Sequence, residues 1–145
     1  MRLPTAFPAE DPGDPRGVRE LLLDTDACIE VIRGNPRPVE AFPDAVFRVS
    51  EVTRFELLSG LRGQAGSRRE ERARAFLEAA TVVPFGAEAA RRAAEVRIEL
   101  EVRGERIGAY DLLVAGQALA LGAGLVTGNL REFRRVPGLQ VCPWE

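Results

Sequence analysis

Short apolar segments alternate along the chain with longer segments of helical period, and this alternation constrains the fold more than any other feature. The apolar segments are 21–23, 46–49, 81–84, 124–127 and 139–142. The segments of helical period are 27–32, 51–61, 68–80, 87–103 and 109–121, and a short arginine-rich helix is expected after residue 129. Strands that alternate with helices favour a parallel sheet covered on both faces. The sequence therefore predicts an α/β sandwich with a mainly parallel central sheet flanked by helices.

The chain length and its first residues predict the domain organisation. A chain of 145 residues is long enough for one ordinary domain with its own core. Residues 1–17 are rich in Pro, Asp and Gly and show no periodicity, so we expect a disordered extension there and a single domain over 18–145. No apolar run approaches the length of about 18 residues that a membrane span requires, and no secretory signal is recognisable. We therefore expect a cytoplasmic protein without a membrane partner.

The chain contains no histidine, and all 20 of its basic residues are arginine. Serine or cysteine catalysis with a histidine base is thereby excluded, as are lysine-dependent phosphate loops and Schiff bases. Cys28 and Cys142 lie far apart in sequence, and we expect both to be buried free thiols. Any catalytic chemistry must therefore use carboxylates. The net charge of −2 argues against non-specific coating of nucleic acid, although it allows a local basic contact.

Three acidic residues lie where such a sheet would place a site. Asp24 directly follows the first apolar segment, Glu56 is on the inward face of the helix that follows the second, and Asp111 is in the first turn of a nearly apolar helix. Each residue also has an ordinary structural explanation. Asp24 could cap a helix, Glu56 could be an exposed glutamate, and Asp111 could be stabilised by the helix dipole. Because Thr25 and Asp26 are also good caps, we expect Asp24 to be available for another role. Ligands of open parallel sheets bind beyond the carboxyl ends of the strands.

If these acids lie close together, their charges require compensation. Two carboxylates about 4 Å apart repel each other by roughly 4 kcal/mol at an effective dielectric constant of about 20. A hard divalent cation relieves this repulsion, and oxygen ligands without His or Cys favour Mg²⁺ or Mn²⁺. Such an ion lowers the pKa of a bound water and neutralises charge on a phosphodiester.

Four segments of the chain resemble, in order, the motifs of the VapC family of PIN domains, from about residue 21 to residue 141. They are 22–26 (LLDTD), 50–57 (SEVTRFEL), 107–115 (IGAYDLLVA) and 125–133 (LVTGNLREF). The chain has Asp26 where the family usually has Asn, and Asn129 where many members carry a fourth acid. This departure leaves the occupancy of a second metal open, with Glu132 or Asp26 as candidates to compensate.

The resemblance implies a PIN-like three-layer sandwich, usually a homodimer, that cleaves structured RNA such as tRNA or rRNA with Mg²⁺ and is inhibited by a VapB-type antitoxin. In this reading the chain is the ribonuclease toxin of a type II toxin–antitoxin system. By the family pattern, Asp24, Glu56 and Asp111 are the metal ligands and Asn129 is an auxiliary catalytic residue. The supporting residues are Thr25, Asp26, Thr127 and Glu132.

Three alternatives are weighed against this reading. A phosphatase similar to haloacid dehalogenases would share the D-x-D pair, but it needs Thr or Val at position 28 and a later Gly-Asp motif. A response-regulator receiver needs a lysine, which the chain lacks. An inactive PIN module that acts by RNA or protein binding stays open.

Two further roles also stay open at this point. Arg54, Arg131 and Arg134 are placed either to hold RNA phosphates or simply to keep the surface soluble. Tyr110 is placed either to stack on a base or to pack against its own helix.

Overall fold

The computed structural model describes residues 19–145, and these residues form one five-stranded sheet in the order β3-β2-β1-β4-β5. All neighbouring strands are parallel. The strands are β1 (Arg19–Leu23), β2 (Ala45–Ser50), β3 (Val82–Val83), β4 (Gly124–Val126) and β5 (Val141–Cys142). The helices are α2 (Thr25–Ile32), α3 (Arg37–Glu40), α4 (Glu51–Ser59), α5 (Arg68–Ala79), α6 (Ala87–Val102), α7 (Ala109–Leu121) and α8 (Leu130–Phe133).

The central strand β1 divides the core into two parts because its side chains alternate between the faces of the sheet. Leu21 and Leu23 join a buried cluster with residues of α2, α4 and α5. Leu22 joins a second cluster with residues of α6, α7 and α8. The protein is therefore a three-layer sandwich, and the predicted fold class is confirmed.

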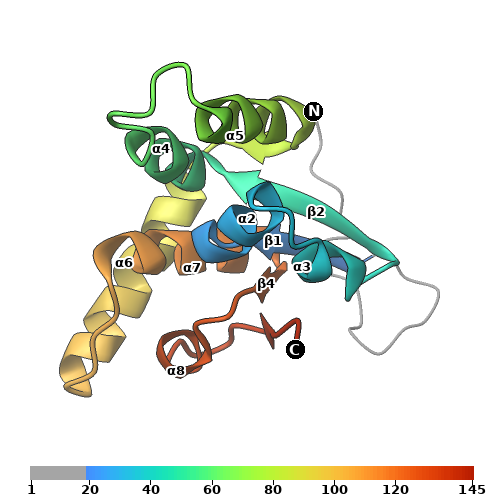
Figure 1. Ribbon diagram of the computed structural model, residues 1–145. Coiled ribbons are helices and arrows are strands. Elements are labelled where there is room, and N and C mark those ends of the chain that lie inside the picture. The colour runs from blue at the N-terminus through green and yellow to red at the C-terminus, as the bar shows by residue number, and fades with distance from the viewer. Residues whose placement is uncertain (1–18) are drawn as a thin grey trace.

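The strand order places β1 between β2 and β4, which is the point where the winding of the chain reverses. The carboxyl ends of β1 and β4 meet there, and the Asp24 amide donates to the Val126 carbonyl at 3.1 Å. Figure 1 shows α2, α4 and the start of α7 gathered on the left, at the end toward which β1 and β2 run. A crevice at such a reversal is the usual ligand site of open α/β sheets.

The two long helices on the second face pack closely because α7 has a glycine at the contact. A Cβ atom added to Gly116 would lie 2.5 Å from the Cβ of Ala93 on α6. The contact fixes α7, whose first turn carries Asp111, against α6.

The predicted elements differ from the structure mainly at their ends. The segment 81–84 contributes only Val82–Val83 to the sheet, since Pro84 has no amide hydrogen to donate. The last strand is Val141–Cys142 rather than 139–142, because the Leu139 amide donates within the preceding turn to Val136. The short helix α3 was not predicted, and a proline at its start supports it.

Other expectations concern the cysteines, the membrane and the first residues. Cys28 and Cys142 are buried free thiols, as predicted. Within residues 19–145 no helix is both long and apolar enough to cross a membrane. The prediction of a disordered extension at 1–17 lies outside the described residues.

Candidate active site

Asp24 begins the site, as the first residue after β1 and the N-cap of α2. Its Oδ1 accepts a hydrogen bond from the Ala27 amide at 2.7 Å, and its carboxylate also accepts from the Thr127 hydroxyl. The expectation that another residue would cap this helix was wrong: α2 begins at Thr25, so the cap position falls on Asp24. Capping and a role in the site are nevertheless compatible, because a carboxylate has several lone pairs.

The environment of Asp24 opposes its ionisation. The residue is only 3% exposed. Burial is the main reason that its pKa is raised to about 7, and the charges of Asp26 and Asp111 raise it further against the hydrogen bonds from Thr127 and Ala27. A nearby cation would therefore favour the ionised form of this carboxyl group.

Glu56 reaches the site from α4, which begins where Ser50 caps it by accepting from the Val52 amide. The Thr25 hydroxyl donates to Glu56 Oε1 at 2.5 Å and lies 3.1 Å from the Thr53 hydroxyl oxygen. Two threonines from α2 and α4 thus hold the half-buried Glu56 toward the start of α2. The role of Thr53 was not predicted, although its place one helical turn before Glu56 was a usable signal.

Asp111 lies in the first turn of α7, whose N-cap Gly108 offers no side chain. Burial is the main reason that the pKa of Asp111 is raised to about 6, and the charges of Glu132, Glu56 and Asp26 raise it further. Negative charges on α8, α4 and α2 thus act on this carboxylate of α7.

Glu132 is held beside Asp111 by two hydrogen bonds. Its Oε1 accepts from the Gly108 amide at 2.9 Å, and its Oε2 accepts from the Asn129 side-chain amide at 2.6 Å. Asn129 is itself positioned by its backbone amide, which donates to the Thr127 hydroxyl oxygen at 2.9 Å. Glu132 therefore links α8 to Gly108, the residue just before the helical turn that carries Asp111.

The site residues named from sequence thus form one connected set at the carboxyl ends of β1 and β4. Within residues 19–145, however, no three acidic, His or Cys side chains are arranged closely enough to hold a metal ion as they stand. The Thr25 hydroxyl, the Ala27 amide and the Asn129 side-chain amide instead donate hydrogen bonds to Glu56, Asp24 and Glu132.

The donor chemistry of the set nevertheless suits a hard divalent cation. Every candidate ligand is an oxygen, and two of the carboxylates, Asp24 and Asp111, have pKa values raised mainly by burial and further by neighbouring negative charges. If a divalent ion binds here, oxygens of Asp24, Glu56 and Asp111 would hold it, and its positive charge would offset their mutual repulsion.

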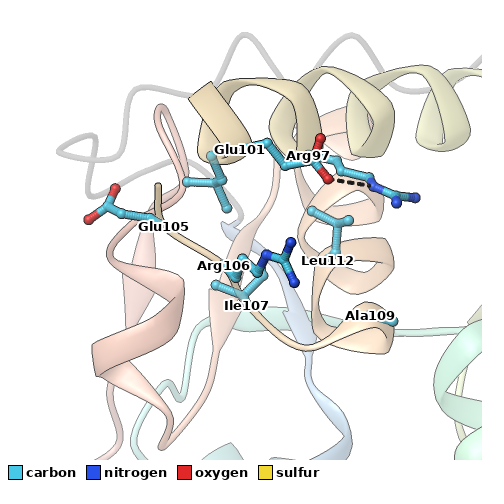
Figure 2. Close-up of a pocket in the computed structure, with 8 residues that line it drawn as sticks. Arg97, Glu101, Glu105, Arg106, Ile107, Ala109 and Leu112 are labelled. Carbon is cyan, nitrogen blue, oxygen red and sulfur yellow. Dashed lines mark hydrogen bonds and ion pairs between the residues drawn. The ribbon is translucent and has the colours of Figure 1, made fainter. Parts of the chain in front are cut away.

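Several hollows lie around this set without enclosing it, and one of about 480 Å³ beside α2 has Asp26 in its lining. A groove of about 520 Å³ between α2, α4 and α5 has Glu56 at its edge, apolar walls that include Ile29, Leu57 and Leu61, and several arginines. A smaller cavity of about 290 Å³ lies between the end of α6 and the start of α7 (Figure 2). Arg97 and Glu101 form an ion pair at its wall, and none of the candidate carboxylates lines it.

A second polar contact below the site was not predicted. The Ser50 hydroxyl donates to the buried Gln117 Oε1 at 2.9 Å, joining the end of β2 to α7. A glutamine inside an otherwise apolar helix was the signal that this position needs a polar partner.

Comparison with known proteins identifies the family. Residues 21–139 match the family model described as PIN domain. A Salmonella typhimurium protein named tRNA(fMet)-specific endonuclease VapC is 33% identical over 129 residues, which are 86% of this chain and 98% of that protein. Ribonuclease VapC2 of Rickettsia felis is 31% identical over 130 residues, with coverage of 86% and 97%.

Solved structures agree with the sequence relatives. A chain in the crystal structure of Rickettsia felis VapBC2 bound to a promoter DNA fragment aligns with a TM-score of 0.78 and 30% identity, covering 87% of this chain and 99% of that one. A chain in DNA-bound VapBC from Salmonella typhimurium aligns with a TM-score of 0.73 and 32% identity, covering 88% and 100%. These matches exclude the phosphatase and receiver alternatives. The chain therefore belongs to the VapC family of PIN-domain ribonucleases, the toxins of toxin–antitoxin pairs.

Proposed function

We propose that the chain hydrolyses RNA phosphodiester bonds with Mg²⁺, or Mn²⁺ in its place, bound at the carboxylate set. The observation that carries the proposal is the gathering of acidic side chains from different elements at the carboxyl edge of the sheet, where burial and the charge of Asp111 raise the pKa of Asp24 and the charges of Glu132 and Glu56 raise that of Asp111. Negative charges that are close together and partly withdrawn from water are costly unless they are protonated or a cation binds them.

The proposed roles follow from the contacts. Asp24, Glu56 and Asp111 would hold the ion, and Glu132 would supply the fourth carboxylate that position 129 lacks. Thr25 orients Glu56, Thr127 orients Asp24, and Asn129 positions Glu132 while keeping its own side-chain oxygen as an auxiliary donor. A divalent ion bound there supplies a water of lowered pKa and neutralises charge on the phosphate.

For the substrate we propose a structured RNA such as tRNA or rRNA. A relative that is 33% identical is named a tRNA(fMet)-specific endonuclease, which supports this class without defining the target of this chain. We further expect the enzyme to act in the cytoplasm as a homodimer.

For the protein partner we propose a VapB-type antitoxin that occupies the groove between α2, α4 and α5. Apolar side chains line this groove, and Arg33, Arg68, Arg69 and Arg72 surround it. An antitoxin segment with apolar residues on one face and acidic residues on the other would complement both features. Such a segment would also cover Glu56 at the edge of the groove, which explains how binding would inhibit the enzyme.

The test of the proposed function is cleavage of total bacterial RNA by the purified chain in Mg²⁺ and in EDTA, with the cut ends mapped. We expect cuts at defined sites in Mg²⁺, none in EDTA, and a rate at least a hundredfold lower for Asp111→Asn. Asp44→Asn, an exposed aspartate in the loop before β2, is the matched control and should cleave like the wild type. Equal cleavage by wild type and Asp111→Asn would refute the assignment.

One observation keeps an inactive PIN module as a second candidate. Within the described residues no three carboxylates are gathered into a closed ligand set. A module of this kind would bind RNA or protein but leave all RNA intact in Mg²⁺ and Mn²⁺ alike.

A further inference from the structure

Two aromatic side chains are exposed side by side at the edge of the carboxylate set. Phe55 on α4 is 52% exposed and Tyr110 on α7 is 46% exposed. Their ring centroids lie 5.5 Å apart with an interplanar angle of 46°. Two rings from different helices therefore support each other and form a preformed apolar surface, although each leaves about half of its area in water.

The position of this surface is fixed by the same helices that place the acids. Phe55 directly precedes Glu56, and Tyr110 directly precedes Asp111. Successive helical residues are rotated by about 100°, so each ring lies on the helix flank next to its carboxylate. The charge of Glu56 is close enough to raise the pKa of Asp111, so the two carboxylates, like the two rings, lie near each other.

The charge of the site determines which kind of contact can hold a nucleic acid there. Without a bound cation, Asp24, Asp26, Glu56, Asp111 and Glu132 repel a phosphate backbone, and Arg54 beside them is paired with Glu51 at 2.6 Å. Stacking of a base on an aromatic ring does not depend on net charge. An exposed aromatic pair is thus a contact that an acidic site can use to hold RNA.

We propose that Phe55 and Tyr110 form a stacking surface for an unpaired base of the RNA next to the bond that is cut. This inference rests on the proposed function and refines it: the substrate must present at least one unstacked base at the site, as in a loop or a bulge. A base inside a continuous duplex has both faces covered and cannot stack on the pair.

The test uses binding rather than cleavage, in the Asp111→Asn background so that the RNA stays intact. The probe is a fluorescein-labelled single-stranded RNA hexamer, and its affinity is measured by fluorescence anisotropy against a fully paired duplex of the same length. We expect Phe55→Ala and Tyr110→Ala each to weaken single-strand binding by roughly 5- to 100-fold. Tyr110→Phe, which keeps the ring, should bind like its parent.

A matched control removes exposed apolar surface elsewhere. Val102 on α6 is 82% exposed, and Val102→Ala should leave single-strand binding unchanged. Binding of the duplex should be unchanged in every variant. Unaltered single-strand affinity in both alanine variants, or no single-strand binding by the parent, would overturn the stacking surface.

The competing occupant of this surface is a second copy of the chain, because Leu58 on α4 extends it as a further partly exposed apolar residue. Sedimentation velocity on the same variants distinguishes the two. If Phe55→Ala or Tyr110→Ala dissociates a dimer, and if the affinity for the single-stranded RNA is lost only in variants that have become monomers, the proposal is overturned. Failure of the binding test with intact metal-dependent cleavage by the wild type would reject this inference alone and leave the proposed function standing.

Discussion

Replacing Asp24 by asparagine should stabilise the metal-free protein, and the gain should depend on pH. Asparagine keeps the oxygen that accepts from the Ala27 amide, so the cap of α2 is retained while the charge is removed. The pKa of Asp24 is about 7 in the folded protein against an ordinary 3.8, so the folded state binds more protons than the unfolded state between these values. The contribution of Asp24 to the unfolding free energy of the wild type is therefore present at low pH, and it is lost as the pH rises toward 7.

The size of the effect follows from the same pKa values. At pH 8 the ionised Asp24 is disfavoured in the folded state by on the order of 4 kcal/mol, and this cost is absent in Asp24→Asn. At pH 4 the carboxyl group is neutral in the folded protein, and the difference between the two proteins should shrink to about 0.5 kcal/mol. Asp111 titrates in both proteins, so the comparison reports Asp24 together with its coupling to Asp111.

The assay is urea denaturation in EDTA at pH 4 and pH 8, followed by the fluorescence of Trp144, the only tryptophan of the chain. Trp144 packs against the core cluster that contains Leu21 and Leu23, so its signal reports global unfolding. Asp44→Asn at an exposed position controls for the loss of one negative charge. The same change in unfolding free energy at both pH values, or a destabilised Asp24→Asn at pH 8, would refute the reasoning.

Three further predictions follow from single contacts. Glu132→Gln should lower the pKa of Asp111 in the metal-free protein, since a like charge beside it is removed; carboxyl carbon chemical shifts measured by NMR during a pH titration report this. Thr25→Val removes the hydroxyl that holds Glu56 and should weaken Mn²⁺ binding about tenfold or more in calorimetry. Gly116→Ala places a methyl group against α6 and should lower the unfolding free energy by about 1–3 kcal/mol in urea.

Each of these has a control at an unconstrained position. Glu78→Gln should leave the Asp111 titration unchanged, and Thr81→Val should bind Mn²⁺ like the wild type, because both residues are exposed. A Cβ at Gly60 would meet only ordinary contacts, the nearest at 3.4 Å, so Gly60→Ala should cost less than Gly116→Ala. Equal effects of a variant and its control would contradict the corresponding contact.

The order of strands and helices could be predicted from the sequence because each segment carries its own period and several helices carry their own cap. Ser50 and Ser67, for example, cap α4 and α5 at the residues where a helix start was expected. The lengths of β3 and β5 could not be predicted, because a strand extends only as far as the neighbouring strand offers backbone groups for hydrogen bonds. Neither apolar pattern nor residue preference contains that information.

The site shows the same division between local and long-range information. Positions of Asp24 and Asp111 at the starts of helices followed from neighbouring residues, whereas the contacts that hold Glu56 and Glu132 join residues far apart in sequence. Thr25 reaches Glu56 across 31 positions, and Gly108 reaches Glu132 across 24. The capping role of Asp24 was misjudged because several adjacent residues were equally good caps, and only the register of the helix decides among them.

The central claim is that this fold brings Asp24, Glu56, Asp111 and Glu132 within reach of a shared divalent cation. The most direct test is titration of the full chain with Mn²⁺, followed by electron paramagnetic resonance of the free ion at neutral pH. We predict saturable binding by the wild type and by Asp44→Asn, with an affinity at least tenfold lower in Asp111→Asn and in Glu56→Gln. Binding that is absent in the wild type, or equal in all four proteins, would contradict the account.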